Sequence, residues 1–341
     1  MAETASRIDW VDYSKGICIV LVVMMHSTLG VENALGAQSW LHGFIEWARP
    51  FRMPDFFMLS GLFLASRIDR PWRAYIDTKL LHFAYFYVLW MTIQFALKAQ
   101  SLYAGSTLVE ILIAYAWGFI DPYATLWFIY LLAVFFLVVK ALRWAPPVAI
   151  LLVGAVLEML PIETGNILLD EFAARFIYFY AGYLFASRIF AFADTIASAP
   201  PAALLAVFAA WACLNFWLVE TGAAPLPLVS LALGFAGSAS VVAAGVLLLR
   251  SRWADALRYC GENSIVIYLA FVLFMAPSRI LLIKSGLIAD PGIVSLAVTA
   301  AGIIGPLILF RIIGSTPLRF LFIRPAIFRL TPLSKGRFAT S

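Results

Sequence analysis

Residues 10–30 read WVDYSKGICIVLVVMMHSTLG and place a lysine, Lys15, and a histidine, His26, in an otherwise apolar run. The two are eleven positions apart, which on an α-helix is within about 20° of whole turns and about 16 Å of rise. The spacing therefore predicts one helical face with Lys15 near one end and His26 near the other. An ionisable residue inside a membrane helix costs roughly 2.5–3.5 kcal/mol on insertion scales and usually faces a bundle interior or a wet cavity. His26 is thus a functional candidate; the alternative is that Lys15 reaches the headgroups and His26 hydrogen-bonds at the interface.

The composition indicates an all-α polytopic membrane protein. Of the 341 residues, 63% are hydrophobic and 13% are charged, and the mean hydropathy is +0.94, whereas about 25% of a soluble chain is charged. This length accommodates about ten spans of about 20 residues in a single domain, residues 1–341. The formal charge of +5 is explained by basic cytoplasmic loops and does not indicate nucleic-acid binding. The three cysteines have no spacing typical of a metal site.

Apolar runs predict ten spans and the side on which the chain ends lie. The expected spans are 15–30, 52–66, 79–97, 125–141, 146–161, 172–188, 201–219, 226–249, 263–283 and 293–313. With the N-terminus in the cytoplasm, 18 of the 24 Lys and Arg residues fall on that side, which predicts cytoplasmic N- and C-termini. The tail after about 314 is expected to anchor on anionic lipids. Residues 99–124 are expected to form an amphipathic or re-entrant element at the outer face.

A second charged cluster enters an apolar helix at residues 50–61, PFRMPDFFMLSG. Together with the first span, it resembles the acyltransferase-3 family of integral membrane O-acyltransferases, in its fucose-O-acetylase-like branch. The matching positions are Lys15 and His26, then Phe51, Arg52, Met53, Pro54, Phe56, Phe57, Ser60 and Gly61, with looser matches at Leu126-Trp127-Phe128 and in the 261–268 segment. The resemblance implies a multi-pass protein of the bacterial inner membrane. It also implies transfer of an acyl group, typically acetyl from cytoplasmic acetyl-CoA, to a hydroxyl of an extracytoplasmic carbohydrate.

Two positions depart from the family pattern. Most of the family has Arg where this chain has Lys15, and an ammonium group lacks the bidentate phosphate contacts of a guanidinium. The late motif usually continues Tyr-x-x-His, whereas here it runs from Tyr268 to Phe271. Any role of that second histidine is therefore absent or moved in this chain.

The resemblance and the residue chemistry together suggest catalytic roles for three side chains. Consecutive antiparallel helices place His26 and the Arg52 cluster near one depth. His26 is expected to be the general base, since an imidazole titrates near neutral pH. Arg52 is expected to stabilise the oxyanion or grip the donor, unless it binds lipid phosphate at the interface. Asp55 is expected to orient His26 or to pair with Arg52, because a buried arginine needs a partner.

Further residues are candidates for binding. Lys15 and Arg73 are expected to contact the phosphates of an acyl-CoA donor from the inner face. Trp127 and Arg175 lie in an aromatic-rich outer region suited to a sugar, although aromatic belts explain such residues as well. Tyr268 is expected to line the pore. Ser60-Gly61 lacks the GxSxG context of a nucleophile and is read as a helix-packing contact.

The sequence therefore predicts a membrane O-acyltransferase that uses acyl-CoA, no metal, and a carbohydrate or glycolipid acceptor among membrane lipids. Two other classes remain open. A transporter or flippase would use the same intramembrane charges, although inverted repeats with broken helices are not evident. A non-catalytic membrane subunit would retain the fold, and the departures at Lys15 and Phe271 favour this reading.

Overall fold

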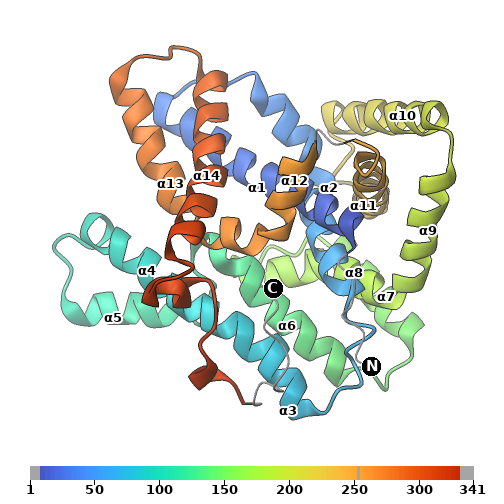
Figure 1. Cartoon of the computed structure of the whole chain (residues 1–341), viewed down its shortest axis with the longest axis horizontal. Helices are drawn as coiled ribbons and strands as arrows, with labels where there is room; N and C mark the ends of the chain where they lie inside the picture. Colours follow the sequence, from blue (N-terminus) through green and yellow to red (C-terminus); the bar gives the residue numbers. More distant parts are fainter. Residues whose placement is uncertain (1–7, 252–253, 331–341) are drawn as a thin grey trace.

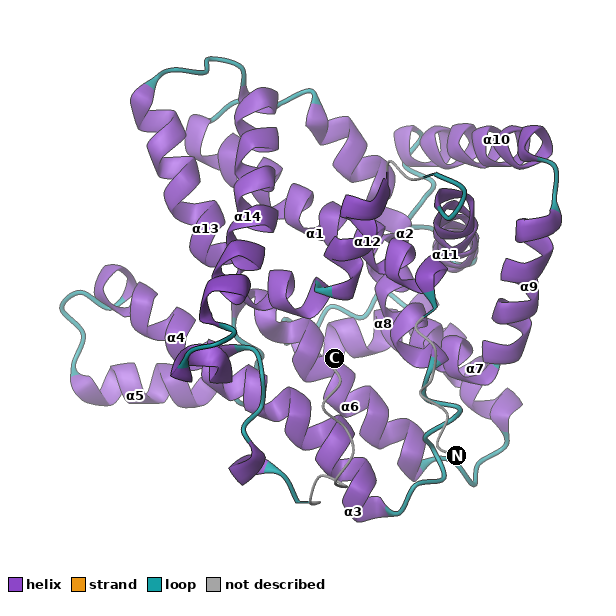
Figure 2. Cartoon of the chain, in the orientation of Figure 1, coloured by secondary structure: helices purple, strands orange, loops and turns teal. Residues whose placement is uncertain are grey.

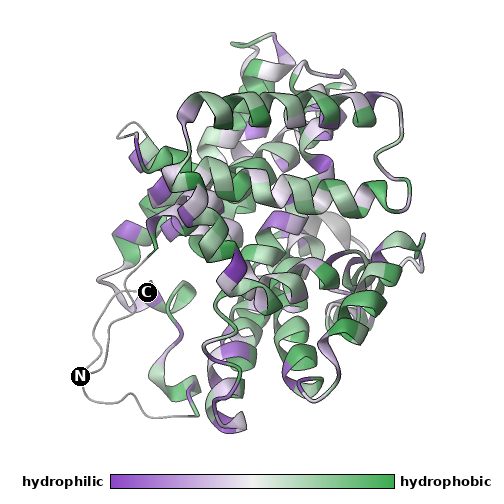
Figure 3. Ribbon diagram, turned by 90° about the vertical axis from the view of Figure 1, so that its right-hand side faces the viewer, coloured by the Kyte–Doolittle hydropathy of each residue, from purple (hydrophilic) through white to green (hydrophobic). Residues whose placement is uncertain are grey.

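A computed structural model describes residues 8–251 and 254–330 of the chain. Within this described part the protein is all-α and contains no strand, as Figure 2 shows. Hydrophobic residues predominate along most helices (Figure 3). This pattern is expected of a chain that buries one helix face against its neighbours and turns another toward lipid.

Within residues 8–251 and 254–330, fourteen α-helices form the bundle drawn in Figure 1. They are α1 (Asp9–Leu35), α2 (Leu41–Leu62), α3 (Trp72–Tyr75), α4 (Leu81–Leu102), α5 (Leu108–Trp117), α6 (Trp127–Ala141), α7 (Pro147–Met159), α8 (Ile167–Leu184), α9 (Ala186–Ser198), α10 (Pro201–Glu220), α11 (Val229–Leu248), α12 (Asp255–Glu262), α13 (Ser264–Ser285) and α14 (Pro291–Ile313). Short elements are the π-helix η1 (Ile76–Leu80) and the 3-10 helices η2 (Ala124–Leu126), η4 (Pro317–Leu321) and η5 (Ala326–Phe328).

Each of the ten predicted spans falls on a helix, which confirms the all-α membrane architecture. Among the described residues, seven helices are long and apolar enough to cross a membrane, or eight if α8 and α9, bent by 76°, form one broken span. The other two expected spans are α2, which carries four charged residues, and α7, which has only 13 residues. The count of ten and the cytoplasmic position of both termini remain predictions.

Close contacts between backbones fix the crossing of α2 and α8. A Cβ added to Gly61 would lie 2.2 Å from the Phe179 carbonyl oxygen, and one added to Gly182 would lie 2.1 Å from the Met58 carbonyl oxygen. Only glycine permits this approach, which confirms the reading of Ser60-Gly61 as a packing contact. The Ser60 hydroxyl donates to the Phe56 carbonyl at 2.7 Å within its own helix. The crossing lies near the C-terminal ends of both helices and holds α2 beside α8.

The segment after α14 packs against the protein, in contrast to the expected lipid anchor. Arg324 is buried and its Nη2 lies 2.7 Å from the Asp77 carboxylate in η1. The Trp90 indole of α4 donates to the Leu321 carbonyl at 2.9 Å, and Tyr85 donates to the Phe320 carbonyl at 2.9 Å. A buried guanidinium needs a carboxylate partner, so this ion pair holds Arg324 inside the protein. Residues 331–341 lie outside the described residues.

Residues 103–126 form a short helix and a turn instead of a full span. α5 begins with a capping box, in which the Glu110 backbone nitrogen donates to the Thr107 hydroxyl at 3.3 Å and Glu110 accepts from the Thr107 backbone at 2.7 Å. The side chains of α5 are largely exposed, in agreement with the expected amphipathic or re-entrant element. A turn then leads through η2 into α6.

Candidate active site

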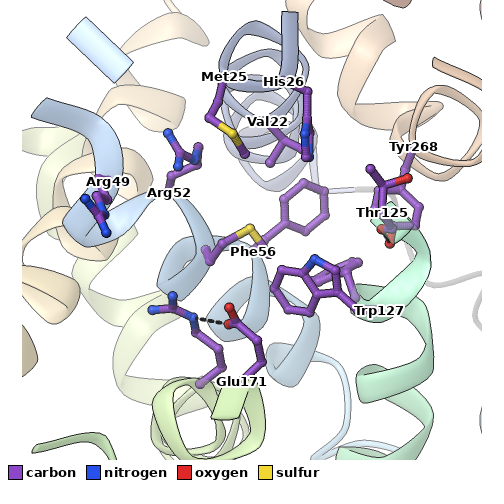
Figure 4. A pocket seen from close by; sticks show the side chains of 13 residues that line it. Val22, Met25, His26, Arg49, Arg52, Phe56, Thr125, Trp127, Glu171 and Tyr268 are labelled. Carbon is purple, nitrogen blue, oxygen red and sulfur yellow. Dashed lines mark hydrogen bonds and ion pairs between the residues drawn. The ribbon is translucent and has the colours of Figure 1, made fainter. Parts of the chain in front are cut away.

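A pocket of about 320 Å³ lies between α1, α2, α6, α8 and α13. Figure 4 shows its side chains converging from these separate helices. The lining residues are Val22, Met25, His26, Arg49, Arg52, Met53, Phe56, Thr125, Trp127, Phe128, Glu171, Arg175 and Tyr268. We call this cavity the reaction pocket. It brings together five residues singled out in the sequence, namely His26, Arg52, Trp127, Arg175 and Tyr268.

One side of the reaction pocket is basic. Arg49 and Arg52 come from α2, as Figure 4 shows, and Arg175 comes from α8. Arg175 Nε lies 2.9 Å from Glu171 one turn earlier, and this pair is the ordinary i,i+4 arrangement of a helix. Arg52 is largely buried, and its Nη1 donates to the Ile45 carbonyl at 3.1 Å while its Nε has no partner among the described residues. Three guanidiniums against one carboxylate make a cavity that favours an anion.

His26 reaches the pocket from the C-terminal half of α1. Its ring contacts the ring of Phe271 in α13, with ring centres 5.4 Å apart and planes inclined by 33°. Within the described part of the chain, the imidazole makes no hydrogen bond to another residue. Its polar atoms are therefore available to a ligand. The Phe271 position is also the one at which the sequence departs from the Tyr-x-x-His pattern, so the departure falls directly beside His26.

The wall opposite the arginines is aromatic. Trp127 opens α6, and Phe56 of α2 lies between this wall and His26 in Figure 4. The Tyr268 hydroxyl donates to the Thr125 carbonyl, which ties α13 to the turn before α6. Such a mixture of apolar surface and a few convergent polar groups is typical of a small-molecule site.

Comparison of the sequence with known proteins identifies the family of this chain. Residues 8–311 match the family described as acyltransferase domain, Acyl_transf_3. The chain belongs to this family. It is also similar to the inner membrane protein YcfT of Escherichia coli (strain K12), with 29% identity over 160 residues, covering 38% of this chain and 43% of that protein. No solved structure matches the chain. The acyltransferase-3 resemblance is thereby confirmed, and the chain is a multi-pass membrane protein of an acyltransferase family.

Asp55 lies away from its expected place. Its side chain is fully buried and does not line the reaction pocket. Within the described residues its carboxylate forms neither an ion pair with Arg52 nor a hydrogen bond with His26. It lies toward Ser238 of α11, whose hydroxyl donates to the Gly234 carbonyl at 2.8 Å. Residues three apart on a helix are neighbours, so the difference comes from the helices packed against α2: Asp55 faces α11, whereas Arg52 donates to the Ile45 carbonyl and lines the pocket.

The two expected donor contacts, Lys15 and Arg73, also lie outside the pocket. Lys15 Nζ is 4.0 Å from the Asp12 carboxylate and 5.7 Å from the centre of the Phe63 ring. Arg73 is exposed and donates to the Leu330 carbonyl at 3.2 Å. Lys15 is instead close enough to Lys79 to interact electrostatically, and it belongs to a basic region at the opposite end of α1 from His26.

Three polar lining residues were not assigned to the site from the sequence. Arg49 stands one helical turn before Arg52 and forms an ion pair with Glu46 at 3.1 Å. Glu171 lies one turn before Arg175 and pairs with it at 2.9 Å. No sequence pattern pointed to Thr125. It lines the pocket because of the turn before α6, and a sequence pattern does not reveal the geometry of that turn.

Proposed function

We propose that the protein transfers an acyl group, acetyl in the simplest case, from acyl-CoA to a hydroxyl of an extracytoplasmic carbohydrate. The observation that carries this proposal is the presence of His26 and Arg52, the residues of the two densest family motifs, in one pocket. Membership of an acyltransferase family supports the class of reaction. The positive lining supports a substrate that bears negative charge.

The chemistry needs a base and a stabilised oxyanion. The imidazole of His26 accepts the proton of the acceptor hydroxyl as that oxygen attacks the thioester carbon. Arg52 donates hydrogen bonds to the carbonyl oxygen as it gains negative charge, and positioned donors of this kind contribute strongly because the site excludes water. The carbon–sulfur bond then breaks, the sulfur takes the proton from His26, and an ester and a free thiol result. General-base assistance typically contributes about 10²–10⁴-fold in rate.

The phosphates of the donor need cations, and the chain offers basic groups at both ends of α1. On the reaction-pocket side these are the three arginines. Near the start of α1, Lys15 and Lys79 form the basic region described above, and Arg73 lies in α3. We assign the CoA phosphates to this second region, with Lys15 and Arg73 as contacts, so that the pantetheine arm extends toward His26. This assignment keeps the charged part of the donor out of the hydrocarbon.

The proposed setting is the bacterial inner membrane. The similarity to an inner membrane protein supports this location, as do the seven or eight apolar helices. The acceptor in this setting is a cell-surface carbohydrate or a glycolipid, surrounded by membrane lipids. No metal is invoked in the reaction.

The test is mass spectrometry of surface glycans from cells with the gene deleted, restored, and restored as His26→Ala. We expect one acyl group to be lost on deletion and to return only with the unmodified gene. Leu29→Ala is the matched control, because Leu29 lies on the same helix with 41% of its surface exposed and does not line the pocket. Equal membrane levels of all proteins, measured by immunoblot, separate loss of chemistry from loss of folding.

Identical glycans in every strain would overturn the proposal. Movement of a substrate across vesicles containing the purified protein, without release of CoA thiol, would favour a transporter. Acylation that persists in the His26→Ala strain but disappears on deletion would assign the chain the role of a non-catalytic subunit.

A further inference from the structure

A second pocket, of about 480 Å³, lies at the outer end of α4 and beside α5. Its lining residues are Tyr103, Glu110, Ile113, Ala114, Trp117, Gly118, Asp121, Pro122, Tyr123, Ala124 and Ile167. Three of these are aromatic and two are acidic. We call this cavity the aromatic pocket.

The two pockets adjoin at one turn of the chain. Ala124 lines the aromatic pocket, and the next residue, Thr125, lines the reaction pocket. The start of α8 also contributes to both pockets. Ile167 lines the aromatic pocket, and Glu171, one helical turn later, lines the reaction pocket. A ligand seated in the aromatic pocket is therefore adjacent to the chamber that holds His26.

The dividing turn is held in an unusual conformation. Ala124 has φ of 49°, in the left-handed region that alanine rarely adopts. Hydroxyl groups hold the turn on both sides. The backbone nitrogen of Tyr123 donates to the Tyr87 hydroxyl at 3.0 Å, and Tyr268 donates to the Thr125 carbonyl. Backbone strain that persists under such constraint is concentrated at functional sites, which favours a role for this turn beyond connecting two helices.

The chemistry of the aromatic pocket is suited to a sugar. Tyr103, Trp117 and Tyr123 offer flat, amphipathic surfaces. The carboxylates of Glu110 and Asp121 accept hydrogen bonds from hydroxyl groups. Among the described residues, no Lys or Arg lines the cavity, and Lys98 stands over the Tyr123 ring at 5.8 Å from its centre. Two carboxylates disfavour an anionic group in this cavity, whereas the arginines of the reaction pocket favour negative charge that develops at the thioester end of the donor.

We propose that the aromatic pocket is the acceptor subsite, and that it holds a sugar unit next to the unit whose hydroxyl enters the reaction pocket. This inference rests on the proposed function. It adds that the thioester end of the donor and the hydroxyl-rich acceptor bind in two adjoining cavities whose linings differ in charge. The Ala124–Thr125 turn sets the distance between the bound sugar and the reacting one.

Kinetics with both substrates varied test the subsite. The acceptor is the surface glycan of the source cells after mild alkaline removal of ester-linked acyl groups, and the donor is acetyl-CoA. We expect Trp117→Ala to raise the KM for glycan about 10-fold and Glu110→Gln about 3-fold, with the KM for acetyl-CoA changed less than about 2-fold. Leu112→Ala is the control, because Leu112 is exposed on the same helix and does not line the pocket. Equal shifts in both KM values, or none in the glycan KM, would overturn the proposal.

A binding measurement keeps the inference testable if no transfer is observed. Ala114→Cys, in a background of Cys213→Ala and Cys260→Ala, places a thiol in the lining of the aromatic pocket. The deacylated glycan should slow maleimide labelling of this thiol at least about 5-fold, and Trp117→Ala should abolish the protection. Protection without transfer would support the subsite while contradicting the proposed function. Transfer without protection would support the proposed function and contradict the subsite. If phosphatidylglycerol vesicles slow the maleimide labelling and the glycan does not, the cavity binds lipid.

Discussion

The reaction pocket and the aromatic pocket share a turn and a helix start, yet their linings are of opposite charge. The first draws on five helices that are far apart in the sequence and gathers three arginines, one glutamate and His26. The second is built almost entirely from residues 103–124 and carries two carboxylates with three aromatic rings. The contrast indicates that the chemistry depends on tertiary packing, whereas the neighbouring cavity is a local feature of one connecting segment.

Removing the Arg52 guanidinium is expected to give the largest difference in kcat between a variant of the reaction pocket and a variant of the aromatic pocket. Arg52→Ala should lower kcat about 10²–10³-fold, the loss typical of a missing oxyanion donor. Arg52→Lys should recover only part of this loss, because an ammonium does not reproduce the planar fork of donors. CoA thiol release at saturating glycan measures the effect. Trp117→Ala should leave kcat within about 2-fold under the same conditions, and a comparable fall in both variants would remove the distinction between the pockets.

Arg175→Gln tests, with a smaller expected effect, whether the charge of the reaction pocket favours the donor over the acceptor. Arg175→Gln removes one cation from the reaction pocket and leaves Glu171 without its partner. Hydrogen bonds to charged groups contribute about 1.5–3 kcal/mol. Losing the bond from Arg175 to the thioester end of the donor, which lies in this pocket, should therefore raise the KM for acetyl-CoA about 10-fold or more. The KM for glycan should change little. Titration with each substrate in turn measures the two constants. An effect on glycan alone would mean that the basic side binds the acceptor.

The sequence was sufficient to predict the helices and much of the reaction pocket. Long apolar runs predict helices because a segment in lipid must satisfy its backbone hydrogen bonds internally, and all ten expected spans fall on helices. His26 and Arg52 were recognised because ionisable residues within apolar runs are usually functional and because both match the family motifs. The small pair Ser60-Gly61 was correctly interpreted as a packing contact.

Three-dimensional relations were harder to predict. Asp55 was expected near Arg52, but its position on the helix turns it toward α11, and the sequence does not reveal which face of α2 each neighbour covers. Arg324 was expected at lipid, whereas it pairs with Asp77, 247 positions away. The aromatic pocket was not predicted, since it depends on a turn that places Ala124 in a left-handed conformation.

The smallest expected effect is that of a substitution at Ala124, in the turn between the two pockets. A left-handed conformation costs an alanine about 1–2 kcal/mol relative to the right-handed one, whereas glycine adopts it freely. Ala124→Gly should therefore raise the apparent unfolding temperature in detergent by a few degrees at most, because glycine also gives the unfolded chain more freedom. If the strained turn fixes the spacing between the pockets, the same variant should lower kcat a few-fold while leaving both KM values nearly unchanged. A less stable variant with unchanged kcat would show that the hydrogen bonds from Tyr87 and Tyr268 set the turn, and that the alanine side chain packs there without positioning the acceptor.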